Sequence, residues 1–258
     1  MVLGVFDSGV GGLTVLREVQ KRHPEQAVIY FADTARLPYG SRSRLEICQF
    51  VREIMQWYSR QNVDRVLMAC NTSSALALET VAPEFALPLH GLIQSAARSA
   101  AQVGQRIGVI ATEATAKSRA YTRAIAEWSA TAQVWEVGCP AFVPLIESGR
   151  ILDLETRRVA SAYLQPLLHN RIDTLIYGCT HYPHLDPLMD LLLPQTVRRL
   201  NPAIAAVEAL APLLMNDLES RNQFFVSGDP VAFAQSAAAL LGYVPQVQQV
   251  HLPQLVLA

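Results

Sequence analysis

Two of the four cysteines follow short apolar runs and precede polar residues, a setting in which a thiol can do chemistry. Cys70 stands in segment 68–72 (MACNT) and Cys179 in segment 177–181 (YGCTH). We expect each to lie at the carboxyl end of a β-strand, where free backbone N–H groups favour a thiolate and suit a substrate carboxylate. For either cysteine alone, core packing is the commoner role.

The two cysteines belong to segments that can be laid against each other. Segments 62–72 and 171–181 each contain an aspartate, an apolar run, a small residue, a cysteine and then polar residues. Segments 4–8 (GVFDS) and 108–112 (GVIAT) form an earlier pair. We infer a weak internal duplication whose halves face each other across a cleft, with one thiol on each side. The matched register indicates two reactive thiols.

Two neighbouring residues could assist these thiols. His181, two residues after Cys179, could orient or activate the sulfur. Asp7 follows the first apolar run and precedes segment 8–12 (SGVGG), which matches neither common phosphate-binding glycine motif. Asp7 either caps a helix or hydrogen-bonds a catalytic thiol or a substrate ammonium group. For Cys48, on a helical pattern, we expect a packing role. Cys139 follows a predicted strand end at 137–138 and could lie near the cleft, but we expect a structural role for it too.

Metal and pyridoxal phosphate are the cofactors to weigh. Cys179, His181 and His184 are of residue types that bind zinc. The predicted strand-to-turn geometry, however, makes it difficult for all three side chains to reach one metal ion. A pyridoxal-phosphate enzyme needs a Schiff-base lysine, and the chain has only Lys21 and Lys117, neither in a suggestive setting. We therefore expect neither a metal nor an organic cofactor.

Short apolar runs alternate with longer amphipathic stretches, which is typical of βα units around parallel sheets. Asp229 and Pro230 are expected to start a helix that ends at Gly242. Strands are predicted over 3–6, 27–32, 65–69, 106–111, 174–178 and 223–226, and helices over segments that include 43–61 and 154–170.

Composition restricts the partners of this chain. Its 258 residues are 51% hydrophobic, which allows a large core, and the net charge of −1 gives no reason to expect a nucleic-acid partner. No apolar stretch is long enough to span a bilayer, and the first residues lack the features of a signal peptide. We therefore expect a cytoplasmic protein without a membrane or nucleic-acid partner.

Several motifs together resemble those of glutamate racemases, within the aspartate/glutamate racemase superfamily. The resemblance covers essentially the whole chain and rests on segments 6–15 (FDSGVGGLTV), 37–40 (LPYG), 69–72 (ACNT), 139–149 (CPAFVPLIESG), 178–183 (GCTHYP) and 225–229 (FVSGD). It implies two pseudo-symmetric, doubly wound α/β domains with parallel sheets and an active site in the cleft between them. The implied domains are 1–92 plus 205–258, and 93–204.

The resemblance also implies a mechanism. Cys70 and Cys179 exchange the α-proton of L- or D-glutamate without a cofactor, with Asp7 supporting Cys70, and His181 with Glu147 supporting Cys179. The implied substrate contacts are Asp7, Ser8, Tyr39, Gly40, Asn71, Thr72, Thr112, Thr180 and His181.

The family further implies a homodimer whose product, D-glutamate, enters peptidoglycan and so serves cell-wall biogenesis and cell shape. The chain departs from the family at His184, where an aliphatic residue is expected, and at Asn201, where an aspartate is commoner. No extension precedes Met1, so regulation by a cell-wall precursor is not expected.

Three other functions remain open from the sequence. The first is an aspartate or other amino-acid racemase of the same superfamily. The second is a two-lobed ligand-binding module, although the missing signal peptide argues against it. The third is a cysteine hydrolase that uses Cys179 and His181, which would accumulate an acyl-enzyme.

Overall fold

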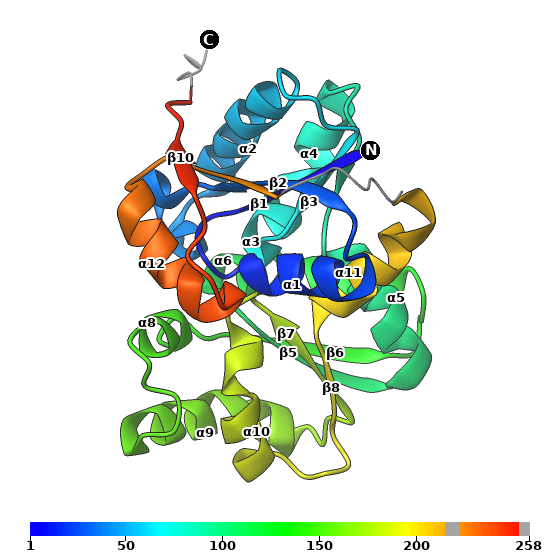
Figure 1. The fold of residues 1–258 in the computed structure, drawn as a ribbon. Helices are drawn as coiled ribbons and strands as arrows, with labels where there is room; N and C mark the ends of the chain where they lie inside the picture. Colours follow the sequence, from blue (N-terminus) through cyan, green and yellow to red (C-terminus); the bar gives the residue numbers. More distant parts are fainter. Residues whose placement is uncertain (215–221, 253–258) are drawn as a thin grey trace.

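The computed structural model describes residues 1–214 and 222–252 (Figure 1). Within them, the strands form two parallel sheets that lie one above the other in Figure 1. Residues 215–221 and 253–258, which belong to the predicted domain segment 205–258, lie outside the described residues. No helix of the described part is long and apolar enough to cross a membrane.

The first sheet contains the strands from both ends of the chain. Its order is β10-β9-β2-β1-β3-β4, and all neighbours pair in parallel. Strand β2 is buried at every residue, as expected for an inner strand covered on both faces. The strands are β1 (Val2–Asp7), β2 (Ala27–Ala32), β3 (Arg65–Met68), β4 (Leu89–His90), β9 (Gln223–Val226) and β10 (Val247–Gln249).

Helices cover both faces of this sheet and bury two apolar clusters. On one face pack α1 (Leu13–Arg22), α11 (Pro202–Leu210) and α12 (Pro230–Leu241). On the other face pack α2 (Arg44–Tyr58) and the segment of α3 (Asn71–Leu76) and α4 (Leu78–Val81). The short 3₁₀ helices of this part are η1 (Thr34–Arg36), η2 (Tyr39–Ser41), η3 (Ala82–Glu84) and η5 (Ala211–Leu213).

The second sheet repeats the arrangement with fewer strands. Its order is β6-β5-β7-β8, again parallel throughout, with β5 (Arg106–Ala111), β6 (Gln133–Gly138), β7 (Thr174–Gly178) and β8 (Arg198–Leu200). One face is covered by α5 (Ile93–Val103), α6 (Glu113–Ser118) and α7 (Ala120–Ala126). The other is covered by α8 (Phe142–Glu147), α9 (Leu154–His169), η4 (Tyr182–Leu185) and α10 (Asp186–Leu192).

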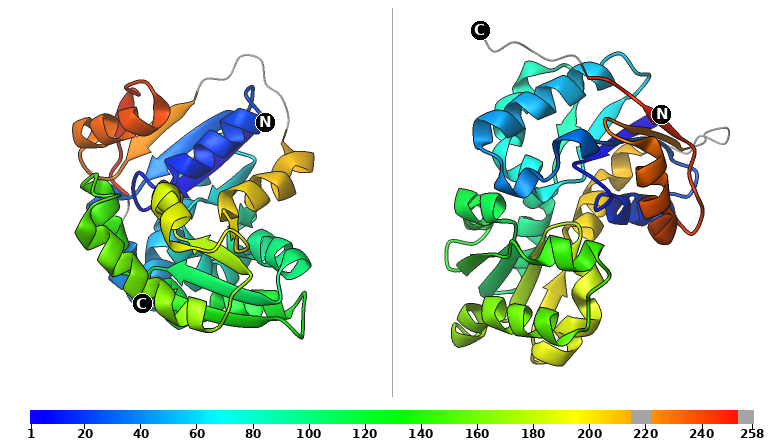
Figure 2. Two further views of the ribbon diagram at one scale, coloured as in Figure 1. Left: turned by 90° about the horizontal axis from the view of Figure 1, so that it is seen from below. Right: turned by 90° about the vertical axis from the view of Figure 1, so that its left-hand side faces the viewer.

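The predicted fold class is confirmed: the chain forms two parallel α/β layers with helices on both faces. Predicted strands 27–32, 106–111, 174–178 and 223–226 coincide with β2, β5, β7 and β9. Strand β1 extends one residue beyond its prediction at each end, and β3 ends one residue before its prediction. Strands β4, β8 and β10 were not predicted, and of β6 only the end before Cys139 was. Helix α11 crosses the predicted domain boundary at 204/205, and Figure 2 shows the C-terminal elements beside the first sheet.

Local capping explains where two of the helices begin. The side chain of Asp229 accepts hydrogen bonds from the N–H groups of Val231 and Ala232, and Pro230 occupies the first turn of α12. The helix ends at Gly242, whose φ of 78° lies in the left-handed region. Ser43 and Glu46 form a reciprocal capping box before α2. The predicted start and end of α12 are confirmed.

Candidate active site

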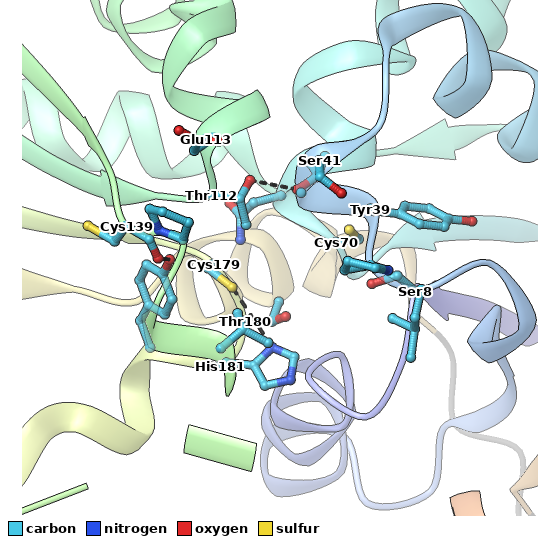
Figure 3. A pocket seen from close by; sticks show the side chains of 18 of the residues that line it. Ser8, Tyr39, Ser41, Cys70, Thr112, Glu113, Cys139, Cys179, Thr180 and His181 are labelled. Carbon is cyan, nitrogen blue, oxygen red and sulfur yellow. Dashed lines mark hydrogen bonds between the residues drawn. The ribbon is translucent and has the colours of Figure 1, made fainter. Parts of the chain in front are cut away.

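A cavity of about 200 Å³ lies between the carboxyl ends of the two sheets. It is smaller than the ~300–1,000 Å³ usual for drug-sized ligands, which suits a small metabolite. All twelve residues expected to form the catalytic and substrate-binding site line it: Asp7, Ser8, Tyr39, Gly40, Cys70, Asn71, Thr72, Thr112, Glu147, Cys179, Thr180 and His181. The first sheet's half contributes seven of them and the second five, so the two halves enclose the cavity together (Figure 3).

The two cysteines reach the cavity from different halves. Cys70 follows β3 and Cys179 follows β7, and Figure 3 shows them on different sides of the pocket. They are close enough for the charge of Cys179 to raise the pKa of Cys70. The two cysteines that correspond in the matched sequence segments therefore both line this small cavity.

The environment of Cys70 favours the neutral thiol. Burial raises its pKa to about 12; the Asp7 carboxylate adds to the rise, and hydrogen bonds from Ser73 oppose it. The sequence-based expectation that a helix start favours the thiolate is therefore wrong for Cys70. Helix α3 has only six residues. The stabilisation of a thiolate by its N-terminus does not offset the cost of removing solvent from a sulfur that is almost fully buried.

Asp7 organises the turn before α1 and lies near Cys70, without a hydrogen bond to its sulfur in the described part of the chain. Its Oδ2 accepts the N–H of Gly12 at 2.7 Å and that of Gly9 at 3.3 Å, which fixes the turn before α1. Burial raises the pKa of Asp7, whereas the charge of His181 and the backbone N–H groups lower it. No hydrogen bond joins Asp7 to Cys70 within the described residues, so its effect on that thiol is through charge.

Around Cys179 the structure forms a relay of three groups. The Cys179 Sγ lies 3.8 Å from His181 Nδ1, and His181 Nε2 lies 3.1 Å from Glu147 Oε1. Burial lowers the pKa of the ring. Hydrogen bonds to Cys179 and Glu147 and the charges of Cys179 and Asp7 outweigh that effect and raise the pKa to about 10. The ring is therefore an imidazolium at neutral pH, and a cation beside a sulfur stabilises its thiolate.

Gly11 allows α1 to approach this relay. A Cβ at Gly11 would lie 2.5 Å from the His181 ring and 2.5 Å from Thr180 Oγ1. The hydroxyl of Thr14, on the same helix, donates to the carbonyl of Thr180 at 3.1 Å. The glycine-rich segment after β1 thus brings the first half against the Cys179 side, a function that the sequence motif alone did not indicate.

Polar groups on both halves supply donors to the cavity. The side-chain nitrogen of Asn71 is buried without a hydrogen-bond partner among the described residues. The hydroxyls of Thr72 and Thr112 lie 2.9 Å apart across the two halves, and Thr115 contacts both. These groups can bind the oxygens of a carboxylate.

The hydroxyl of Tyr39 is fixed by a group of residues that was not predicted from the sequence. Its hydroxyl donates to the fully buried carboxylate of Asp33, which also accepts from Arg36 at 2.6 Å and from Ser227 at 2.7 Å. The phenol is therefore engaged away from the sulfurs, and Figure 3 shows its oxygen pointing out of the pocket. Asp33 directly follows β2, and its position at the end of a strand could have identified it as a site residue from the sequence.

The remaining candidates divide as follows. Cys48 lies on α2 and packs in the core, whereas Cys139 is buried and also lines the cavity. His184 donates its backbone N–H to the His181 carbonyl, and Asn201 caps α11. No group of three or more His, Cys, Asp or Glu residues in the described ranges could hold a metal ion.

The arrangement suits proton exchange at a carbon held between the sulfurs. Cys70 is a neutral thiol that can give a proton, and Cys179 lies beside the His181 imidazolium. Unpartnered donors nearby can oppose negative charge on a carboxylate.

Comparisons with known proteins identify the family of this chain. The family model for Asp/Glu/Hydantoin racemase matches residues 14–210. A glutamate racemase from Gloeobacter violaceus is 63% identical over 259 residues, which cover 99% of this chain and 98% of that protein.

Two solved structures are similar over nearly their full length. A glutamate racemase from Bacillus anthracis has a TM-score of 0.93 and 33% identity, with 98% of each chain covered. One from Francisella tularensis, in complex with D-glutamate, has a TM-score of 0.89 and 32% identity, with 96% of each covered. This chain belongs to the Asp/Glu/hydantoin racemase family.

Proposed function

We propose that this chain racemises glutamate with Cys70 and Cys179 as its two acid–base groups. The observation that carries the proposal is the placement of two buried thiols, one from each half, on one cavity of about 200 Å³. Glutamate is the substrate named for its similar relatives, and it is small enough for this cavity. Inversion needs a proton removed from one face of the α-carbon and another delivered to the opposite face.

We assign Cys179 as the base and Cys70 as the acid in the starting state. The Cys179 thiolate, beside the His181 imidazolium, removes the α-proton; its S–H bond forms as the C–H bond breaks, and the electron pair passes toward the substrate carboxylate. The Cys70 thiol then protonates the opposite face and becomes the thiolate. The reverse reaction starts from this second state, and no cofactor takes part. By family inference, Cys179 acts on L-glutamate and Cys70 on D-glutamate.

Substrate binding is assigned to the polar lining. The amide nitrogen of Asn71 and the hydroxyls of Thr72 and Thr112 bind carboxylate oxygens. Asp7 attracts the ammonium group. Further contacts come from Ser8, Tyr39, Gly40, Thr180 and His181, where Tyr39 acts through its backbone because its hydroxyl is bound to Asp33.

Other inferences follow from the family resemblance. The domains are 1–92 with 205–258, and 93–204. The active enzyme is a cytoplasmic homodimer, and its D-glutamate enters peptidoglycan. The small cavity and its polar lining support a small-molecule substrate rather than a macromolecule.

Two cysteine variants test the proposal. Cys70→Ser and Cys179→Ser each keep the side-chain size but lose the acidity of a thiol, so we expect racemisation to fall about 10³-fold or more. Circular dichroism from each glutamate enantiomer measures the rate, and proton NMR in deuterium oxide measures exchange at Cα with no cofactor added. Cys48→Ser is the matched control, because Cys48 lies in the core away from the cavity.

Full activity in either variant contradicts the assignment of the thiols. Faster turnover of aspartate than of glutamate by the unmodified protein contradicts the substrate. A burst of acyl-enzyme with an activated ester would instead indicate a hydrolase.

A further inference from the structure

One hydrogen bond fixes the side chain of Asn71 from the opposite half of the molecule. The hydroxyl of Tyr121 donates to Asn71 Oδ1 at 2.6 Å, and both residues are buried. Asn71 opens α3 beside the first sheet, whereas Tyr121 lies on α7 beside the second. Neither the Tyr121 position nor this contact was predicted from the sequence.

The bond determines which end of the amide remains for a ligand. With Oδ1 occupied, the NH₂ group is the end without a partner in the described residues, and Asn71 lines the cavity. If the amide were rotated by half a turn, its NH₂ group could donate to the phenol oxygen, but the amide oxygen and the phenol proton would both lack a partner, because Asn71 is the only hydrogen-bond partner that the described residues offer the Tyr121 hydroxyl. An unmade buried hydrogen bond is costly, so the observed orientation is favoured.

We propose that Tyr121 is a positioning residue that holds the Asn71 amide with its NH₂ group toward a carboxylate oxygen of the substrate. The inference rests on the proposed function, in which Asn71 binds substrate. It adds a residue outside the cavity that selects a donor rather than an acceptor at this point of the lining.

The surroundings of Tyr121 suit a fixed donor. Its ring is fully buried in the apolar cluster beneath α5, α6 and α7, so the hydroxyl has no solvent partner. Burial, with the charges of Glu136 and Cys179, raises the pKa of the phenol well above its ordinary value, so it keeps its proton at any working pH. Glu136 accepts from the backbone and hydroxyl of Thr122, which fixes the start of the same helix.

A double-mutant cycle tests the proposal. The four proteins are the unmodified chain, Tyr121→Phe, Asn71→Ala and the double variant, and calorimetry with racemic glutamate gives Kd without net conversion. We expect Tyr121→Phe to weaken binding about five- to tenfold, the effect of one hydrogen bond. We expect the double variant to bind no more weakly than Asn71→Ala, because Tyr121 acts through Asn71. In Tyr121→Phe, KM should rise by more than kcat falls.

Two more variants complete the design. Tyr177→Phe removes another buried phenol, one bonded to Asp186 rather than to the cavity lining, and should leave Kd unchanged. Asn71→Asp keeps the acceptor for Tyr121 but replaces the NH₂ donor by an oxygen. It should bind glutamate more weakly than Asn71→Ala does.

The outcomes separate this inference from the proposed function. If Asn71→Ala binds glutamate as tightly as the unmodified chain, the assignment of Asn71 to substrate binding is wrong, and this inference is overturned with it. If Asn71→Ala weakens binding but Tyr121→Phe does not, or if the two effects add, only the role of Tyr121 is overturned. Binding by Asn71→Asp equal to that of the unmodified chain also overturns it.

Discussion

Replacing Glu147 by glutamine tests the relay beside Cys179. Glu147 Oε1 lies 3.1 Å from His181 Nε2, and its hydrogen bond is one of the effects that raise the pKa of His181 to about 10. Because the Glu147 side chain is 47% exposed, solvent screens its charge. We therefore expect the pKa of His181 to fall by about one unit, at the low end of the shifts caused by a neighbouring charge. The bond to Cys179 should keep it above its ordinary value.

The sign of the effect on activity follows from which form of the ring is needed. The imidazolium stabilises the Cys179 thiolate, so activity that depends on it is lost as the pH rises through the pKa of His181. In Glu147→Gln this alkaline loss should begin about one pH unit lower, with little change near neutral pH. The same proton stabilises the folded state below the ordinary pKa of 6.5, and that contribution disappears as the pH rises toward about 10.

Racemisation measured by circular dichroism from about pH 7 to about pH 10.5 gives the alkaline limb. The substrate ammonium group titrates in the same range, so the variant is compared with the unmodified chain at each pH. Glu155→Gln is the matched control: Glu155 is 54% exposed and pairs with Arg150 away from the cavity. Histidine NMR should report the same shift directly. An alkaline limb at the same pH in Glu147→Gln and in the unmodified chain would refute the reasoning.

Two further substitutions separate the site from the scaffold. Gly11→Ala places a Cβ 2.5 Å from the His181 ring. We expect the resulting displacement, of the order of 1 Å, to lower kcat about 10²-fold in the same dichroism assay. An unchanged kcat contradicts the close approach. Asp229→Ala removes the cap of α12 and should lower the free energy of unfolding by about 1 kcal/mol in urea denaturation, with kcat unchanged; an unaltered midpoint contradicts the capping role.

Much of the fold was predictable because it depends on local pattern. The buried run 27–32 and the matched segments ending at Cys70 and Cys179 identify strands of parallel sheets from their apolar residues and polar ends. Strands β4, β8 and β10 were missed, and only the end of β6 was recognised. β8 is exposed at two of its three residues, and β6 is only partly buried, so neither has a continuous apolar run. Their strand conformation comes from pairing with an inner neighbour.

The site residues were predicted by type and position, but their states were not. The pKa of Cys70 depends on how deeply the sulfur is buried and on its distance from Asp7, and neither follows from segment 68–72. The hydrogen bond between Tyr121 and Asn71 joins residues 50 positions apart on opposite halves. Such contacts depend on how the two halves meet, which no local pattern encodes.

The two halves share a backbone plan, in which the strand order β2-β1-β3-β4 corresponds to β6-β5-β7-β8, but each thiol has different neighbours. On one side, Cys70 lies near an anion, Asp7, and burial keeps it protonated. On the other, Cys179 lies beside a cation, His181, which Glu147 supports. The two sulfurs therefore have unequal neighbours: burial and an anion favour the neutral thiol at Cys70, whereas a cation lies beside Cys179. We infer that the departure from symmetry, rather than the symmetry itself, prepares the resting site for inversion.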